Sequence, residues 1–197
     1  MNTGSRNKKS PKQITREYEK ATDPGLVRFI ESVRSVSKDE ANRFGYRVSE
    51  IGERQRADAE RLIGEKINAR SNFIGGSEIH HIDYRHGENG AADHSMANTE
   101  DMARIGYVLE NYDNVDLLTD ENGTIKTSGA YTAKDGRPSP IIIYVKKVNG
   151  FHSVVEAVND GKRGRLNIIS SYKSNADPIE INKAQMPRAA ANKPAAP

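Results

Sequence analysis

Hydrophobic side chains in the first half of the chain recur every three or four residues, which is the spacing of one face of an α-helix. The pattern predicts four helical stretches, over residues 24–33, 37–51, 50–65 and 98–110. Asp23 before Pro24 is a typical helix start, and Ser37 opens a sequence that resembles a capping box. These helices are expected to pack together as a supporting layer.

From Asn114 onward the hydrophobic period changes to two, which is typical of β-strands. Strands are predicted at 115–119, 124–128, 141–148, 151–158 and 165–173. Asn149-Gly150 is the signal of a type I′ hairpin, whereas residues 129–140 are rich in Gly, Pro and Ser and are expected to form a loop. Helices followed by an antiparallel meander predict an α+β fold.

Composition divides the chain into a packed part and two tails. Only 35% of the residues are hydrophobic and 29% are charged, so part of the chain is expected to lack a core. We expect a disordered basic arm at 1–22, a helical lead-in at 23–70, a core domain at 71–176 and a disordered tail at 177–197.

The same composition excludes several classes of protein. The chain has no cysteine, which rules out disulfides, thiolate zinc sites and a cysteine nucleophile. No apolar run has the length of a membrane span and no signal peptide opens the chain, so we expect a cytoplasmic protein or a piece of a longer one. The net charge of +3 permits a nucleic-acid partner without requiring one.

Candidate chemistry concentrates in residues 77–87, which hold three of the five histidines. A short helix is predicted there, beginning after Ser77 and stopping at Gly87. His81 and Arg85 are four residues apart and share one helix face, and His86 lies in the last turn, where the helix dipole favours an imidazolium. A base, a cation and an acid on one helix suit proton transfer at a phosphate, although any single histidine could equally have a structural role.

The last predicted strand offers a second group of polar side chains. Strand alternation places Ile168, Ser170 and Tyr172 on one face, where the hydroxyl and the phenol could orient a phosphate. A half-buried strand with a polar outer face is the alternative. Basic residues gather at the hairpin ends and form a rim that could bind a polyanion or only solvate the turns: Lys146, Lys147, Lys162, Arg163 and Arg165.

Six segments occur in the order, and with the element types, of one known group of proteins: 80–87, 95–96, 101–115, 143–150, 154–158 and 166–172. Together they resemble the phage-borne nuclease domains of the barnase, EndoU, colicin and RelE (BECR) superfamily. Such domains are found at the C-terminal end of Mu-type head-morphogenesis (MuF) and polyvalent phage proteins. The resemblance implies helices followed by a four- to five-stranded antiparallel sheet. It also implies metal-independent RNA cleavage, without a cofactor, between the histidine helix and the sheet.

The resemblance also implies roles for individual residues. The expected catalytic residues are His81, Arg85, His86, Ser170 and Tyr172, and the expected substrate-binding residues are Lys146, Lys147 and Arg165. In the expected mechanism a neutral His81 takes the proton of a ribose 2′-hydroxyl, whose oxygen attacks the adjacent phosphorus. A protonated His86 supplies a proton to the leaving 5′-oxygen, so that the product carries a 2′,3′-cyclic phosphate. No residue obviously replaces the catalytic glutamate of barnase.

Two other functions stay open at this point. The first is a metal-dependent nuclease, with ligands drawn from His80, His81, Asp83, His86, Asp93 and His94, although their spacing matches no zinc helix or finger. The second is a non-catalytic virion or adaptor module built on a decayed nuclease fold. The expected partner is RNA, with tRNA among the candidates, and a toxin would also have a cognate immunity protein. Delivery by a virion would place its action in the target-cell cytoplasm.

Overall fold

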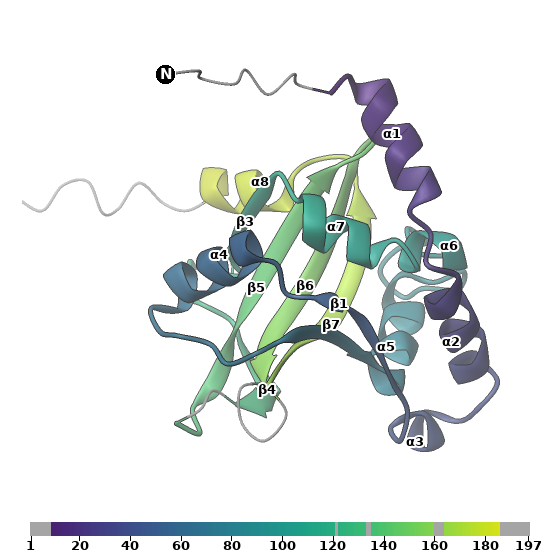
Figure 1. Ribbon diagram of the computed structural model, residues 1–197, viewed down its shortest axis with the longest axis horizontal. Helices are drawn as coiled ribbons and strands as arrows, with labels where there is room; N and C mark the ends of the chain where they lie inside the picture. Colours follow the sequence, from purple (N-terminus) through teal and green to yellow (C-terminus); the bar gives the residue numbers. More distant parts are fainter. Residues whose placement is uncertain (1–8, 121, 133–134, 160–163, 186–197) are drawn as a thin grey trace, which may run out of the picture.

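The computed structural model describes residues 9–120, 122–132, 135–159 and 164–185 (Figure 1). The helices are α1 (Pro11–Lys20), α2 (Pro24–Arg34), α3 (Lys38–Ala41), α4 (Glu53–Ile63), α5 (Gly76–His86), α6 (Thr99–Met102), α7 (Ile105–Asn111) and α8 (Pro178–Gln185). The strands are β1 (Gly45–Glu50), β2 (Ser71–Gly75), β3 (Asn114–Leu117), β4 (Thr127–Thr132), β5 (Pro138–Lys147), β6 (Phe151–Asn159) and β7 (Arg165–Ser174). None of the helices in these ranges is long and apolar enough to span a membrane.

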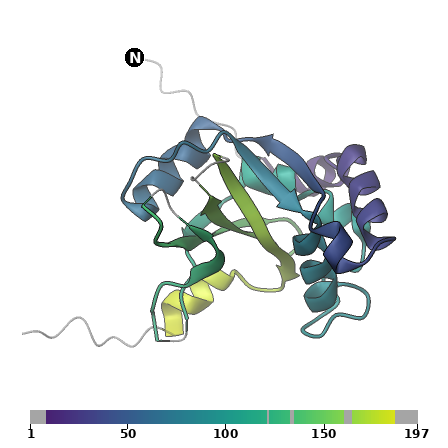
Figure 2. The same ribbon diagram turned by 90° about the horizontal axis from the view of Figure 1, so that it is seen from below.

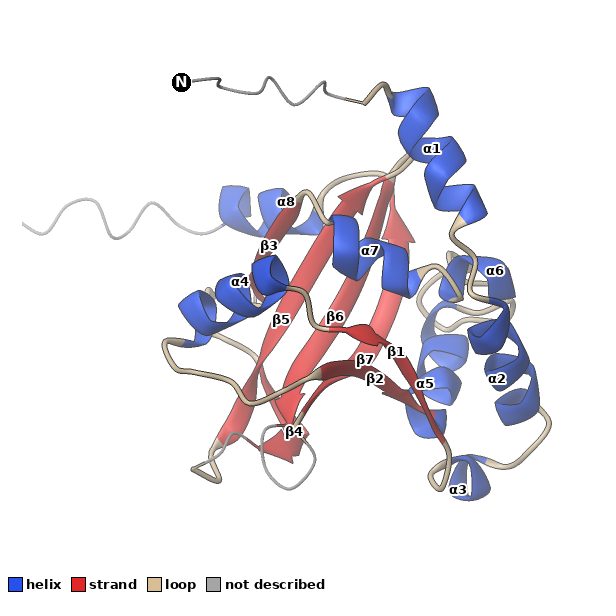
Figure 3. Ribbon diagram, viewed as in Figure 1, coloured by secondary structure: helices blue, strands red, loops and turns tan. Residues whose placement is uncertain are grey.

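Seven strands form one mixed, mostly antiparallel sheet (Figure 3). Its order is β1-β2-β7-β6-β5-β3, with β4 paired to β5, and β2 runs parallel to β7. The predicted α+β class, with helices before the sheet, is confirmed. The sheet exceeds the expected four to five strands because β1 and β2 extend it beyond β7.

The two faces of the sheet differ in what lies against them. We call the face that carries Val154 of β6 the covered face, since Val154 belongs to the main core together with residues of α2, α4, α5 and α7. The face that carries the next residue, Val155, is called the cleft face, and its smaller core includes Ile179 of α8. Figure 2 shows α4 and α8 on opposite sides of the sheet. The cleft face is therefore covered only in part.

The N-terminal segment corrects one expectation. Residues 1–22 were expected to be disordered, but Pro11–Lys20 forms α1 with a complete capping box at Ser10. Tyr18 is buried, and its hydroxyl lies 2.8 Å from Nδ1 of His152 and 3.2 Å from Oδ1 of Asp101. The side chain of Tyr18 thus anchors a polar helix. A local sequence pattern could not predict this, because His152 and Asp101 lie far away along the chain.

The prediction of one helix from residue 37 to residue 51 is correct only for its first turn, which is α3. Ser37 caps α3 as predicted, but the chain then turns and β1 pairs with β2. Gly45 explains the change, because a Cβ at this position would lie 2.0 Å from the Phe73 ring on β2. Strand pairing at this close approach overrides a helical spacing of apolar residues.

Three smaller differences concern the second half. The helix predicted over 98–110 is two helices, α6 and α7. The loop expected over 129–140 contains most of β4 and the start of β5. The tail expected over 177–197 begins with α8, which the buried Ile179 attaches to the sheet, while residues 186–197 lie outside the described residues.

A β-bulge in β7 decides which side chains face the cleft. Val155 pairs with Ser170 and Glu156 pairs with Ile168, so Ile169 is an extra residue in β7. Ile168 is therefore buried in the main core on the covered face, whereas Ser170 lies on the cleft face. The prediction that these two residues share a face with Tyr172 is correct for Ser170 and wrong for Ile168.

Candidate active site

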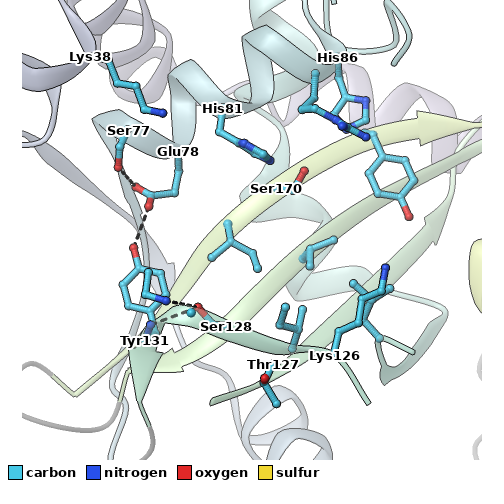
Figure 4. A pocket seen from close by; sticks show the side chains of 18 residues that line it. Lys38, Ser77, Glu78, His81, His86, Lys126, Thr127, Ser128, Tyr131 and Ser170 are labelled. Carbon is cyan, nitrogen blue, oxygen red and sulfur yellow. Dashed lines mark hydrogen bonds between the residues drawn. The ribbon is translucent and has the colours of Figure 1, made fainter. Parts of the chain in front are cut away.

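A cleft of about 790 Å³ opens on the cleft face of the sheet, between α5 and the segment that contains β4 (Figure 4). Side chains of β5, β6 and β7 form its floor, among them Ile141, Val155 and Ile169. The five catalytic residues expected from the sequence all line this cleft: His81, Arg85, His86, Ser170 and Tyr172. The tertiary structure thus brings the histidine helix and the last strand together at one cleft.

Helix α5 presents its histidines because its opposite side is fixed in the core. Ile79 and Ile82 are fully buried, which leaves His81 and Arg85 exposed on the side toward the cleft. The helix begins at Gly76, one residue before the predicted Ser77. Gly76 is required there, since a Cβ would lie 2.4 Å from the carbonyl oxygen of Ala41 at the end of α3.

His86 is buried at the end of α5 and has a carboxylate partner. Its Nδ1 lies 2.9 Å from Oδ2 of Asp93, so the ring N–H donates a hydrogen bond to the carboxylate. The ring also stacks on Tyr172 with a centroid distance of 5.3 Å. Burial alone would raise the pKa of Asp93, but hydrogen bonds from Ser95 and His86 outweigh it and hold that pKa below its ordinary value. A charged carboxylate therefore fixes the orientation of His86.

The surroundings of His81 differ from those of His86, which has a carboxylate partner, because the charges that act most strongly on the His81 ring are positive. Partial burial, together with the positive charges of Arg85 and His86, lowers the pKa of His81 below its ordinary value of 6.5. The ring is therefore neutral at neutral pH and can accept a proton. In Figure 4 the imidazole of His81 points from α5 into the space above Ser170.

The hydroxyls of β7 complete the opposite side of this space. Ser170 and Tyr172 both line the cleft, on either side of Ser171, which faces the main core. Burial raises the pKa of Tyr172, so its phenol stays protonated and can act as a hydrogen-bond donor.

The cleft also contains polar residues that the sequence did not single out. Its remaining polar lining consists of Lys38, Ser77, Glu78, Lys126, Thr127, Ser128 and Tyr131. Glu78 accepts hydrogen bonds from the hydroxyls of Tyr131, at 2.8 Å, and Ser77, at 2.9 Å (Figure 4). Its position three residues before His81 is a helical signal that could have identified it. Tyr131 had no such signal, because its segment reads as a loop.

The expected substrate-binding residues lie elsewhere. Lys146 is buried with its amine 2.8 Å from Oδ1 of Asp113, and neither it nor Lys147 lines the cleft. Lys146 and Lys147, which were expected to bind substrate, therefore lie outside the cleft that the expected catalytic residues line. Arg165 lines a neighbouring groove, whereas Lys162 and Arg163 are outside the described residues.

The six side chains considered as metal ligands do not converge. In the described ranges, no group of three or more His, Asp or Glu residues is placed to hold a metal ion. Asp83 instead binds the guanidinium of Arg34 at 2.6 and 2.8 Å, and Nδ1 of His94 faces the carbonyl oxygen of Gly87. The geometry therefore gives no support to the metal-site alternative.

Comparison with models of known protein families finds a match over most of the chain. The family model described as phage-Barnase-EndoU-ColicinE5/D-RelE like nuclease3 matches residues 49–180, which include the sheet from β2 to β7 and helix α5. No curated protein and no solved structure matches the chain.

Proposed function

Because the chain belongs to the phage-Barnase-EndoU-ColicinE5/D-RelE like nuclease3 family, we propose that it is a metal-independent endoribonuclease. The proposed reaction is attack of a ribose 2′-hydroxyl on the adjacent phosphorus, which leaves a 2′,3′-cyclic phosphate and a free 5′-hydroxyl. One observation carries the proposal: two of the three imidazoles of α5, those of His81 and His86, line the same cleft as the hydroxyls of Ser170 and Tyr172 on β7.

His81 is the general base in this proposal. A base must be unprotonated before it acts, and the lowered pKa of His81 keeps its ring neutral at neutral pH. Its exposed position on α5 also allows a ribose to approach it.

His86 is the general acid. The carboxylate of Asp93, 2.9 Å from Nδ1, compensates the positive charge that His86 carries before it gives up a proton. Because Nδ1 is occupied by Asp93, Nε2 is the atom that would donate to the leaving 5′-oxygen. Stacking on Tyr172 restricts the rotation of the ring.

The remaining polar residues would stabilise the charge that develops on the phosphate. Arg85 and Tyr172 provide a cation and a neutral donor next to the two histidines, and Ser170 provides a hydroxyl between them. Lys38 and Lys126 add positive charge to the cleft walls. We assign Glu78 to positioning, since both of its oxygens already accept hydrogen bonds from protein hydroxyls.

The test is cleavage of a single-stranded RNA by the purified protein in excess chelator, with analysis of the product ends. We expect cyclic-phosphate ends, no cleavage of the same sequence as DNA, and loss of activity in His81→Ala and in His86→Ala. His94→Ala is the matched control, because His94 is an exposed histidine outside the cleft.

Three results would contradict the proposal. Activity that disappears in chelator and returns with zinc or magnesium would indicate a metal-dependent nuclease. Equal cleavage of DNA would exclude attack by a 2′-hydroxyl. A folded protein that leaves RNA intact under all conditions, with or without metal, would indicate a binding module. Expression in bacteria, with total RNA analysed for new cyclic-phosphate ends, extends the same test to the natural substrate and to a toxin function.

A further inference from the structure

A second groove of about 430 Å³ adjoins the cleft. Ser77, Glu78 and Tyr131 line both, so the two spaces meet at the hydrogen bond between Tyr131 and Glu78. The other lining residues come from the turn before β1, from the first residue of β1, from β2 and from β7: Asn42, Arg43, Phe44, Gly45, Phe73, Gly75, Arg165 and Asn167. A chain that leaves the cleft on this side would enter the groove.

Phe44 is an exposed aromatic side chain on a fixed backbone. The residue is 49% exposed, so its ring is accessible to a ligand. Yet its N–H donates to the carbonyl of Ala41 at 3.0 Å, and its own carbonyl accepts from the N–H of Gly76 at 3.1 Å. Because Gly76 is the first residue of α5, the backbone of Phe44 is held at a set position relative to the helix that carries His81.

A planar cation is held on the other side of the groove. The guanidinium of Arg165 lies 3.8 Å above the centroid of the Phe73 ring. The absence of a side chain at Gly45 allows that ring to pack against the backbone of β1, since a Cβ there would lie 2.0 Å from the ring. The Phe73 ring therefore lies between the guanidinium of Arg165 and the backbone of β1.

The charge of the groove is also informative. Arg43 and Arg165 are cationic, and Glu78 is the one carboxylate among the described residues that line it. Both oxygens of Glu78 already accept hydrogen bonds, from Tyr131 and Ser77. Proteins bind single-stranded nucleic acids with this combination of side chains: the aromatic ring stacks on a base, and the arginines contact phosphates.

We propose that this groove is a nucleotide subsite for single-stranded RNA, next to the phosphodiester that the cleft would cleave. An unpaired base stacks on Phe44, and the phosphate beside it is held by Arg43 and Arg165. The inference rests on the proposed function of the cleft, because the groove can hold a neighbouring nucleotide only if the cleft binds the phosphodiester that is cleaved. The proposed subsite predicts that the substrate is an unpaired RNA segment, since a base inside a duplex cannot stack on a protein ring.

Binding tests the subsite without requiring cleavage. The probe is a fluorescent 2′-O-methyl RNA, which has no free 2′-hydroxyl, offered as a single strand and as a duplex of the same sequence. We expect Phe44→Ala to weaken single-strand binding about tenfold, given the usual contribution of one stacked base. Phe44→Trp should keep the affinity. Tyr84→Ala is the matched control, since Tyr84 is a 69% exposed aromatic residue that lines neither space.

Cleavage kinetics then place the subsite relative to the cleft. On a substrate of several nucleotides, Phe44→Ala should raise KM about tenfold with little change in kcat, whereas a dinucleotide should be cleaved equally by both proteins. Cleavage by the wild type with no effect of Phe44→Ala on any substrate, or equal binding of duplex and single strand, would overturn the subsite alone. Binding that depends on Phe44 without any RNA cleavage would instead overturn the proposed function of the cleft.

Discussion

The covered face and the cleft face of the sheet carry the same kinds of side chain with different consequences. On the covered face, Nε2 of His152 lies 2.8 Å from Oγ of Ser171, and Nδ1 lies 2.8 Å from the hydroxyl of Tyr18. Tyr18 is also 3.2 Å from Asp101. A serine, a histidine and an acid are thus linked by hydrogen bonds, as they would be in a catalytic site.

Access separates this cluster from the cleft. His152 and Ser171 are fully buried. Burial lowers the pKa of His152 to about 3, so its ring is neutral at any pH above about 3. His86 also has an acidic partner and an aromatic neighbour, but it lines an open space of about 790 Å³. Hydrogen-bond geometry alone does not identify a site, because a substrate must reach the atoms that react.

The largest expected effect is on activity and belongs to the cleft face. His81→Ala should reduce RNA cleavage about a hundred- to ten-thousand-fold, the usual contribution of one proton-transfer group, with an unchanged melting temperature. Initial rates and thermal unfolding of the same preparation measure both quantities. A residual activity above a tenth of the wild type would remove His81 from the mechanism.

The next effect concerns stability and belongs to the covered face. Burial raises the pKa of Glu156 to about 8, and its Oε2 accepts a hydrogen bond from Gln55 at 3.1 Å. In the unfolded chain this carboxyl releases its proton near pH 4.5, whereas the folded chain retains it to about pH 8. The folded state therefore binds more protons in this window, and the free energy of unfolding falls as pH rises from about 4.5 to about 8.

At about 1.4 kcal/mol per pH unit this loss reaches up to about 5 kcal/mol. Glu156→Gln should abolish most of it while it keeps an acceptor for Gln55. Urea unfolding of both proteins at a series of pH values measures the difference. Parallel stability profiles for the two proteins would show that Glu156 does not hold its proton in the folded state.

A smaller effect tests the polar cluster that anchors α1. Tyr18→Phe removes only the hydroxyl that faces His152 and Asp101, so it should cost about 1–3 kcal/mol of unfolding free energy. Cleavage per folded molecule should be unchanged. Tyr84→Phe is the control, because Tyr84 is largely exposed and should show no change. A loss of activity in folded Tyr18→Phe would mean that the covered cluster communicates with the cleft.

The smallest effect is a shift in pH dependence on the cleft face. The charge of Arg85 contributes to the lowered pKa of His81, so Arg85→Gln should raise that pKa. Since His81 must be neutral to act as a base, the acidic limb of the pH profile of kcat/KM should move to higher pH in the variant. Rates over a pH series, each profile scaled to its own maximum, separate this shift from the accompanying loss of rate.

Much of the fold could be predicted from local patterns. Alternation found four strands, β3, β5, β6 and β7, whereas the strand expected at 124–128 covers only the first two residues of β4. Asp23 and Ser37 cap helices where the sequence indicated. Asn149 and Gly150 have the positive φ angles that their hairpin signal predicts. The pattern failed at β1, where apolar residues at helical spacing form a strand, because the pairing partner lies far along the chain.

For the candidate site, the sequence identified the residue types that line the cleft but not all of its members. His81, Arg85 and His86 could be found because one short helix holds them together. The structure shows the contacts of two further acidic residues, Asp93 with His86 and Glu78 with Tyr131. Contacts of this kind depend on loop conformation and strand order, and the spacing of hydrophobic residues along the chain predicts neither.

The sequence by itself determined the elements and the residues able to carry the chemistry, because hydrogen bonding and side-chain spacing within a helix or strand are local. Only the tertiary structure decided which of those residues have access to a substrate. A single extra residue in β7, Ile169, keeps Ser170 on the cleft face while Ile168 enters the core. The register between strands, and hence the face on which a hydroxyl emerges, is set by the packing of the whole sheet.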